Sequence, residues 1–288
     1  MRISVIIPCY NAASTIGCQL EAIASQEWSE PWEVIVADNG STDNSVAIVK
    51  TFQERIPSLV IVDASAKRGP SFARNCGASV AKGEGLAFCD ADDEVAPGWI
   101  AAMGEALAKY DYVGGYCLHN KLNEPWLAKR YGSEKGSGVD YDHPYLPIVP
   151  SCNMGVKRAV HEAVGGFDEN FMMIEDIDYC WRIQEMGVKV HDAWDAIVQY
   201  RLRKEFKVAC QRAWAIGLHE ALLYKKHKGC GMPKLMSWKT FIKVPIKFVL
   251  ELALLRVRDE YTMLENIRML AWRAGQLQGC FKFKYLPI

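Results

Sequence analysis

The chain has 288 residues, of which 50% are apolar and 24% are charged, a composition typical of a soluble globular protein. This length is enough for one large domain with an appendage. Lysine and arginine together number 34, as do aspartate and glutamate, so the net charge is zero and gives no support to a nucleic-acid partner.

Cysteine usage and hydropathy point to the inside of the cell. The ten cysteines are scattered and form no C-x-x-C pair, which favours buried free thiols over a disulfide framework or a zinc site. The N-terminus reads as a strand rather than a signal peptide. No uncharged apolar window reaches the roughly 18 residues of a membrane-spanning helix. We therefore expect a cytoplasmic protein.

Strand and helix patterns alternate over about the first hundred residues. Apolar runs predict strands at 3–7, 34–36, 59–62, 86–90 and 112–116. Helical spacing of apolar residues predicts a helix after each of the first four strands, near 16–24, 46–52, 71–81 and 99–107. This alternation predicts an α/β fold with a mostly parallel sheet that helices flank on both faces.

The pattern changes after residue 116. Residues 117–150 are irregular and rich in Gly, Pro and Tyr. So long an irregular stretch within a compact domain is usually functional or mobile. Beyond them we expect helices at 157–164 and from Glu175 to Met186, and closing strands at 188–191 and 197–200. From residue 201 onward we expect only helices, at about 204–227, 234–257 and 260–274.

The predicted helix at 234–257 is basic and amphipathic, with apolar residues on one face and Lys239, Lys243, Lys247 and Arg256 on the other. We expect this helix to pack on its neighbours. Peripheral contact with a membrane surface or a partner is the alternative.

Polar side chains follow the predicted strands where each strand ends: Asn11, Asp38, Asp63, Asp90 and Asp92. The carboxyl ends of parallel strands meet at one edge of a sheet, where open α/β sheets bind ligands. Alternation along a strand predicts that Asp90 and Asp92 point the same way, a pair that suits an oxygen-bound divalent cation, and that Asp93 points the other way. Helix capping is the competing role, and we favour it for Asp63, Asp93 and Glu94.

Ligand chemistry is also suggested by the charges near this edge. The Asp38 carboxylate can accept a hydrogen bond from the N–H of a base. Arg68 and Arg74 carry the positive charge that a diphosphate requires, although Arg68 is equally compatible with a solvated surface position. The chain has no G-x-G-x-x-G after its first strand, no P-loop and no serine nucleophile elbow, which disfavours three other enzyme classes.

Six motifs taken together resemble glycosyltransferase family 2, the inverting GT-A enzymes that use nucleotide-diphosphate sugars. They occur in the family's order between residue 3 and about residue 200. They are Val5–Asn11, Val36–Asp43, Arg68-Gly69 with Arg74–Gly77, Asp90–Asp93, Gly165–Asp168 and Glu175-Asp176. The resemblance implies a GT-A, Rossmann-like fold followed by a C-terminal helical extension.

The resemblance also implies a role for each matching position. The nucleotide-sugar site would contain Pro8, Tyr10, Asn11, Asp38, Arg68, Arg74, Asp90, Ala91 and Asp92. Asp90 and Asp92 would hold Mg²⁺ or Mn²⁺ as the D-x-D pair, with Asp92 nearest the metal, and Asp176 would be the catalytic base. The acceptor site would contain Glu175, Ser151, Asn153 and Met154.

Two departures from the family matter. Val198–Arg201 lacks the histidine that many members place after the last strand, which leaves the metal without an obvious further protein ligand. The Gln-x-x-Arg-Trp signature of processive synthases is also missing after Asp176, so we infer that one sugar is added per encounter.

These features predict three segments and one activity. Residues 1–116 would bind the nucleotide sugar, 117–200 the acceptor, and 201–288 would form the helical extension. We expect transfer from a nucleotide-diphosphate sugar, with a UDP-sugar as the first choice, to a glycan or lipid-linked acceptor in polysaccharide biosynthesis. The alternatives are a sugar nucleotidyltransferase and a catalytically silent module that binds nucleotide sugar or glycan.

Overall fold

The computed structural model describes residues 2–130, 136–233, 238–253 and 260–285. Their contacts divide the chain into two compact units, one formed by Met1–Phe171 with Glu175–Leu202 and the other by Met172–Ile174 with Arg203–Ile288. The division at Leu202 falls next to residue 201, where the sequence predicts the start of the helical extension.

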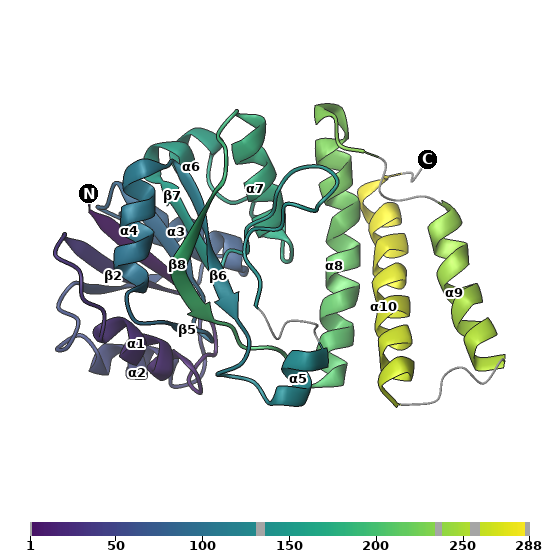
Figure 1. Cartoon of the computed structure of the whole chain (residues 1–288), viewed down its shortest axis with the longest axis horizontal. Helices are drawn as coiled ribbons and strands as arrows, with labels where there is room; N and C mark the ends of the chain where they lie inside the picture. The colour runs from purple at the N-terminus through teal and green to yellow at the C-terminus, as the bar shows by residue number, and fades with distance from the viewer. Residues whose placement is uncertain (1, 131–135, 234–237, 254–259, 286–288) are drawn as a thin grey trace. The chain divides into compact units, whose positions relative to one another are not determined.

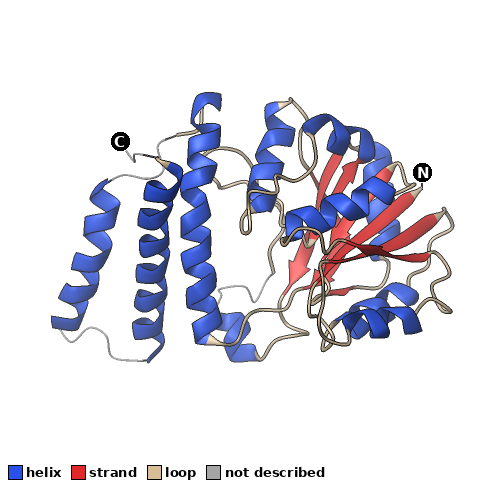
Figure 2. Ribbon diagram, turned by 180° about the vertical axis from the view of Figure 1, so that it is seen from behind, coloured by secondary structure: helices blue, strands red, loops and turns tan. Residues whose placement is uncertain are grey.

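The first unit is built on an eight-stranded mixed sheet in the order β3-β2-β1-β4-β7-β6-β8-β5, with helices on both faces (Figures 1 and 2). The strands are β1 (Ile3–Cys9), β2 (Trp32–Asp38), β3 (Leu59–Asp63), β4 (Gly85–Cys89), β5 (Glu94–Val95), β6 (Tyr112–Leu118), β7 (Asn153–Lys157) and β8 (His191–Gln199). The helices are α1 (Ile16–Ala24), α2 (Ser45–Thr51), α3 (Pro70–Val80), α4 (Trp99–Lys109), α5 (Pro125–Arg130), α6 (Arg158–Val164) and α7 (Glu175–Glu185).

Strands β3, β2, β1 and β4 run parallel, as the βαβ pattern predicts. The side chains of β1 alternate between the two faces. Ile3, Val5 and Ile7 belong to the main core, which α1 and α4 complete. Ile6 lies on the other face, where a Cβ added to Gly77 of α3 would lie 2.6 Å from its side chain. The first four predicted strands are confirmed, and each of their ends lies within two residues of the prediction.

The second half of the sheet differs from the prediction in three ways. β7 pairs antiparallel with both β4 and β6, a direction that the βαβ pattern of the first half does not predict. The two predicted closing strands form the single strand β8, whose register against β6 shifts between Gly115 and Tyr116. Asp93 does not cap a helix: Glu94–Val95 pairs with β8, and α4 begins after Gly98.

The second unit contains α8 (Phe206–His227), the 3₁₀ turn η1 (Lys228–Cys230), α9 (Trp238–Ala253) and α10 (Glu260–Phe283). These elements confirm a helical C-terminal region, and α10 extends beyond its predicted end at 274. Positions 234–237 and 254–257 of the predicted amphipathic helix lie outside the described residues.

Glycines allow α8 and α10 to pack closely and in parallel (Figure 1). A Cβ added to Gly217 would overlap the backbone oxygen of Trp272, and one added to Gly275 would overlap that of Trp214. α9 joins this pair through Phe241, which is buried in a cluster with Tyr224 and other apolar residues.

Candidate active site

The strand order brings three carboxyl ends together at one edge of the sheet. β1 lies between β2 and β4, and Cys9 at the end of β1 is in register with Asp38 at the end of β2. Asp90 follows β4 directly. Neighbouring strands are about 4.8 Å apart, so Asp38 and Asp90 are separated by about 10 Å. This spacing can accommodate part of a nucleotide.

The loops after β1 and β2 hold one another in place. The Asn11 side-chain oxygen accepts a hydrogen bond from the Thr42 N–H at 2.8 Å, and the Asn11 N–H donates to the Ser41 hydroxyl at 3.0 Å. Asn11 has φ +48°, a left-handed conformation that asparagine tolerates. The Asp38 carboxylate accepts the Ser41 N–H at 3.3 Å and remains partly exposed.

Tyr10 and Arg68 come together at this edge. Tyr10 is 47% exposed, and the Arg68 guanidinium lies 4.1 Å from the centre of its ring, within cation–π distance. Pro8, one of the residues assigned to the nucleotide site, lies in β1 two residues before Tyr10 and is partly exposed. Tyr10 and Arg68 thus bring an aromatic ring and a positive charge to the edge on which Asp38 lies.

Asn39 was not among the predicted site residues, because its Asn-Gly context reads as a turn. Its buried side chain donates hydrogen bonds to the backbone oxygens of Ala64 and Lys67, at 2.5 and 2.8 Å. It also accepts one from the Gly69 N–H at 2.9 Å. Asn39 thereby fixes the loop that carries Arg68.

Arg74 links the end of β4 to the start of α7. Its two terminal nitrogens donate to the carboxylates of Asp90 and Glu175, each at 2.7 Å. Arg74 is only 2% exposed. Burial acts to lower the pKa of Arg74, but the two carboxylates outweigh burial and raise that pKa above its ordinary value. Arg74 therefore carries a permanent positive charge, and its guanidinium is already paired with the carboxylates of Asp90 and Glu175.

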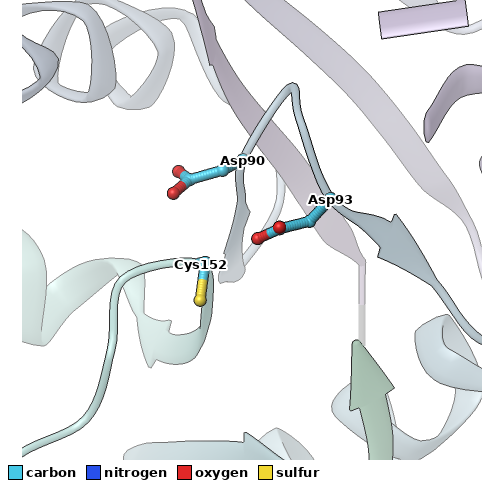
Figure 3. A group of neighbouring side chains, drawn as sticks. All are labelled: Asp90, Asp93 and Cys152. Atoms are coloured by element: carbon cyan, nitrogen blue, oxygen red, sulfur yellow. The ribbon is translucent and has the colours of Figure 1, made fainter. Parts of the chain in front are cut away.

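The turn at 90–93 corrects the predicted side-chain directions. Strand β4 ends at Cys89, so alternation no longer applies, and the turn brings oxygens of Asp90 and Asp93 together with the Cys152 sulfur, all within 4.8 Å of one another (Figure 3). Gln19 of α1 holds the turn through the Asp90 backbone oxygen and the Val95 N–H. Asp92 is partly exposed beside this group but is not one of its members.

This group is a candidate cation site. One Asp93 oxygen accepts the Arg201 N–H at 2.8 Å, whereas the other is buried without a hydrogen-bond partner. Burial, then Asp90 and Asp92, raise the pKa of Asp93 well above its usual range. The carboxylate oxygens suit Mg²⁺ or Mn²⁺. The Cys152 thiol does not, since Cys117 at 3.8 Å and burial raise its pKa.

Asp176 lies in the first turn of α7, next to Glu175, which accepts a hydrogen bond from Arg74. One oxygen accepts the Ile177 N–H at 2.9 Å and the other the Ser151 N–H at 3.4 Å. Burial and the neighbouring Glu175 raise its pKa to about 6, against the lowering effect of Arg74. Ile174, directly before this helix, has φ +57°, which is unusual for a β-branched residue and is typical of strain at functional sites.

The predicted acceptor residues divide into two pairs. Ser151 and Glu175 lie beside Asp176 and are 5% and 7% exposed. Asn153 and Met154 lie in β7 and are fully buried. The Asn153 amide is occupied by the Tyr116 and Ala196 backbone oxygens and by the Trp99 indole N–H. Strand pairing thus buries both side chains.

The Gly165–Asp168 motif has a structural role. Asn75 and Phe167 exchange two hydrogen bonds of 2.9 Å, from the Phe167 N–H to the Asn75 oxygen and from the Asn75 amide to the Phe167 oxygen. Gly166 has φ +69°, and a Cβ there would lie 2.7 Å from the Asn75 side chain. This contact holds α6 and α7 against α3.

The sequence profile of Glycosyl transferase family 2 matches residues 4–165, more than half of the chain. The chain belongs to glycosyltransferase family 2. It is 29% identical over 216 residues to glycosyltransferase AglE of Haloferax volcanii, with 72% of this chain and 71% of that protein covered. It is 25% identical over 229 residues to the minor teichoic acid biosynthesis protein GgaA of Bacillus subtilis, with 73% of this chain and 49% of GgaA covered.

Solved structures agree on the GT-A fold. One is the mannosyltransferase PcManGT of Pyrobaculum calidifontis in complex with GDP-Man and Mn²⁺, which superposes with a TM-score of 0.66 at 20% sequence identity. The match covers 98% of this chain and 86% of the PcManGT chain. TarS of S. aureus in complex with UDP-GlcNAc has a TM-score of 0.55 at 16% identity and covers 99% of this chain and 93% of that one. This family 2 member is therefore a glycosyltransferase with a GT-A fold.

Two further observations concern the cysteines and the search for membrane-spanning helices. All ten cysteines have free thiols. Among the helices of the described residues, none combines the length and the apolar character needed to cross a membrane.

Proposed function

We propose that the chain is a nonprocessive inverting glycosyltransferase that transfers a sugar from a nucleotide-diphosphate sugar, with a UDP-sugar as the first candidate, to a hydroxyl of a glycan or lipid-linked acceptor. One observation carries the proposal: Glu175, the neighbour of Asp176, is joined through Arg74 to Asp90 at the end of β4, and burial and Glu175 raise the pKa of Asp176 to about 6. A base beside an acidic strand end is the arrangement that a single displacement requires.

In this proposal the nucleotide lies across the ends of β1 and β2. Tyr10 and Asn11 contact the base or ribose, and the Asp38 carboxylate accepts an N–H of the base. Arg68 lies beside the diphosphate. Arg74 acts as a positioning residue, because both of its terminal nitrogens are already paired with carboxylates.

Asp90 and Asp92, with Asp93 beside them, are the proposed ligands of Mg²⁺ or Mn²⁺. The partnerless Asp93 oxygen and the carboxylate donors fit such a cation. When bound, the cation would stabilise the charge that develops on the departing diphosphate. The relatives that share this fold include structures with Mn²⁺, and that observation supports the proposal without identifying the metal here.

Asp176 would remove the proton from the acceptor hydroxyl as its oxygen attacks the anomeric carbon from the side opposite the diphosphate. Bond formation and bond breaking occur in one displacement, so the configuration inverts without a protein nucleophile. With a pKa of about 6, Asp176 is ionised and still basic at neutral pH. Ser151 and Glu175 would lie on the acceptor side. The ten free thiols favour action in the reducing interior of the cell.

The test compares Asp176→Asn and Asp92→Ala with Asp63→Asn, which alters an exposed carboxylate at the neighbouring end of β3. A thermal-shift screen of nucleotide sugars, with and without Mn²⁺, first identifies the donor. Asp176→Asn should bind the donor but lower transfer at least about a thousandfold, whereas Asp63→Asn should keep it. Retained transfer in Asp176→Asn would refute the base assignment.

Product analysis separates the two alternatives. A nucleotidyltransferase would release pyrophosphate from a nucleoside triphosphate and a sugar phosphate. A silent binding module would show a donor-dependent thermal shift without hydrolysis or transfer. Loss of transfer in EDTA, restored by Mn²⁺ or Mg²⁺, is expected if the acidic cluster holds a cation.

A further inference from the structure

The α9 helix carries an exposed apolar stripe. Trp238, Ile242, Ile246 and Val249 are 47%, 61%, 52% and 61% exposed, and Leu250 beside them is 53% exposed. Their spacing of three or four residues places these side chains on one side of the helix. Such side chains are normally turned toward a protein core, so a continuous exposed stripe indicates a contact that the described residues of its own unit do not provide.

The stripe is not the side by which α9 packs within its own unit. Phe241, which is 7% exposed, packs in the cluster with Ala221, Tyr224 and Cys280 of α8 and α10. Phe241 precedes Ile242 by one residue, or about 100° around the helix. The apolar arc of α9 is therefore wider than its packing on α8 and α10 requires.

Charge decides which surface fits the stripe. Lys239 and Lys243 each follow a stripe residue by one position, so they border it on the side away from Phe241, and both are exposed. The segment from Tyr224 to Leu250 contains seven lysines and no aspartate or glutamate, although the whole chain has zero net charge. A second copy of this face would bring like charges together, whereas anionic lipid headgroups would neutralise them.

We propose that α9 is a membrane-docking helix that lies in the plane of an anionic lipid surface. The stripe enters the boundary between headgroups and acyl chains, and the bordering lysines reach the headgroup phosphates. Trp238 sits at the start of the stripe, as an interfacial aromatic anchor does. This inference concerns binding alone and does not depend on the identity of the donor or acceptor.

The experiment measures co-sedimentation of the full chain with vesicles of phosphatidylcholine, with and without phosphatidylglycerol, in the absence of any sugar nucleotide. Lys239→Glu/Lys243→Glu should lower the partition coefficient on phosphatidylglycerol vesicles at least about thirtyfold, the effect of losing two attractive charges, and repulsion from the two new carboxylates adds to it. Ile242→Ser/Ile246→Ser should lower it about tenfold or more. Increasing the salt concentration should weaken binding of the wild type.

Matched controls come from the first unit. Met186→Ser removes a side chain that is 50% exposed, close to the 52% of Ile246, and Lys50→Glu/Lys109→Glu reverses two exposed charges. Both controls should bind as the wild type does. Circular dichroism confirms that each variant is folded, and light scattering gives its mass.

Three results would overturn the proposal. One is a wild type that does not sediment with phosphatidylglycerol vesicles. Another is control variants that lose as much binding as the α9 variants. The third is a wild-type dimer that Ile242→Ser/Ile246→Ser converts to monomer, which would make the stripe an interface between copies.

Discussion

Replacing Arg74 by methionine should destabilise the first unit strongly. The change keeps an unbranched apolar stem but removes two charge-assisted hydrogen bonds of 2.7 Å from a residue that is 2% exposed. Each such bond contributes about 1.5–3 kcal/mol, and removing one partner of a buried pair leaves a charge without compensation. We therefore expect the free energy of unfolding to fall by about 3–5 kcal/mol.

The assay is urea unfolding followed by tryptophan fluorescence, with the slope and the midpoint fitted together. Arg55→Met is the matched control, because Arg55 makes an equally short pair with Glu21 on the surface, where the two side chains are 51% and 60% exposed. Water screens that pair, so its loss should leave the free energy of unfolding nearly unchanged.

A triple variant tests the cause. In Arg74→Met/Asp90→Asn/Glu175→Gln the two carboxylates are neutral, so most of the lost stability should return. The reasoning is refuted if Arg74→Met costs no more than Arg55→Met, or if the triple variant is as unstable as Arg74→Met alone.

Three further predictions concern protonation and packing. Because the pKa of Asp176 is raised to about 6, transfer should fall about tenfold per pH unit below pH 6 and level off above it; a flat pH–rate profile would contradict this base. Burial raises the pKa of Glu220 from 4.5 to about 7, despite hydrogen bonds from Gln276 and Trp272, so the folded state holds its proton more tightly than the unfolded state. Stability should therefore fall as pH rises from about 4.5 to 7, and Glu220→Gln should remove about 1–3 kcal/mol of that loss in thermal unfolding measured across pH. Gly275→Ala should cost about 1–3 kcal/mol, because the added methyl group meets the Trp214 backbone oxygen, whereas Gly229→Ala meets nothing within 4 Å and should be neutral in the same assay.

The sequence alone determined the strands and helices of the first half of the sheet and the edge at which their carboxyl ends lie. Strand and helix periodicity are local properties of the chain, so 3–7 and 86–90 could be recognised as buried strands without knowledge of their partners. Parallel strands place their carboxyl ends on one edge, so Asp38 and Asp90 could also be assigned to a common edge.

The burial of Asn153 and Met154 and the exposure of one side of α9 could not be predicted from the sequence, although these residues had been singled out. Asn153 and Met154 carry no local signal that separates a loop from an antiparallel strand, and only pairing with β4 and β6 buries them. The apolar face of α9 was visible as a pattern, but only packing shows that Phe241 is covered while Ile242 and Ile246 are exposed.

The chemistry of the site was decided by tertiary structure. Arg74 and Glu175 are 101 positions apart in the chain, and the hydrogen bond between them depends on how α7 docks against α3. Asp93 turns toward Asp90 because the chain leaves β4 one residue before the acidic cluster begins. Sequence periodicity specifies which side chains share a face of an element. The three-dimensional path of turns and loops specifies which side chains are buried and which charges meet, and burial together with Glu175 raises the pKa of Asp176.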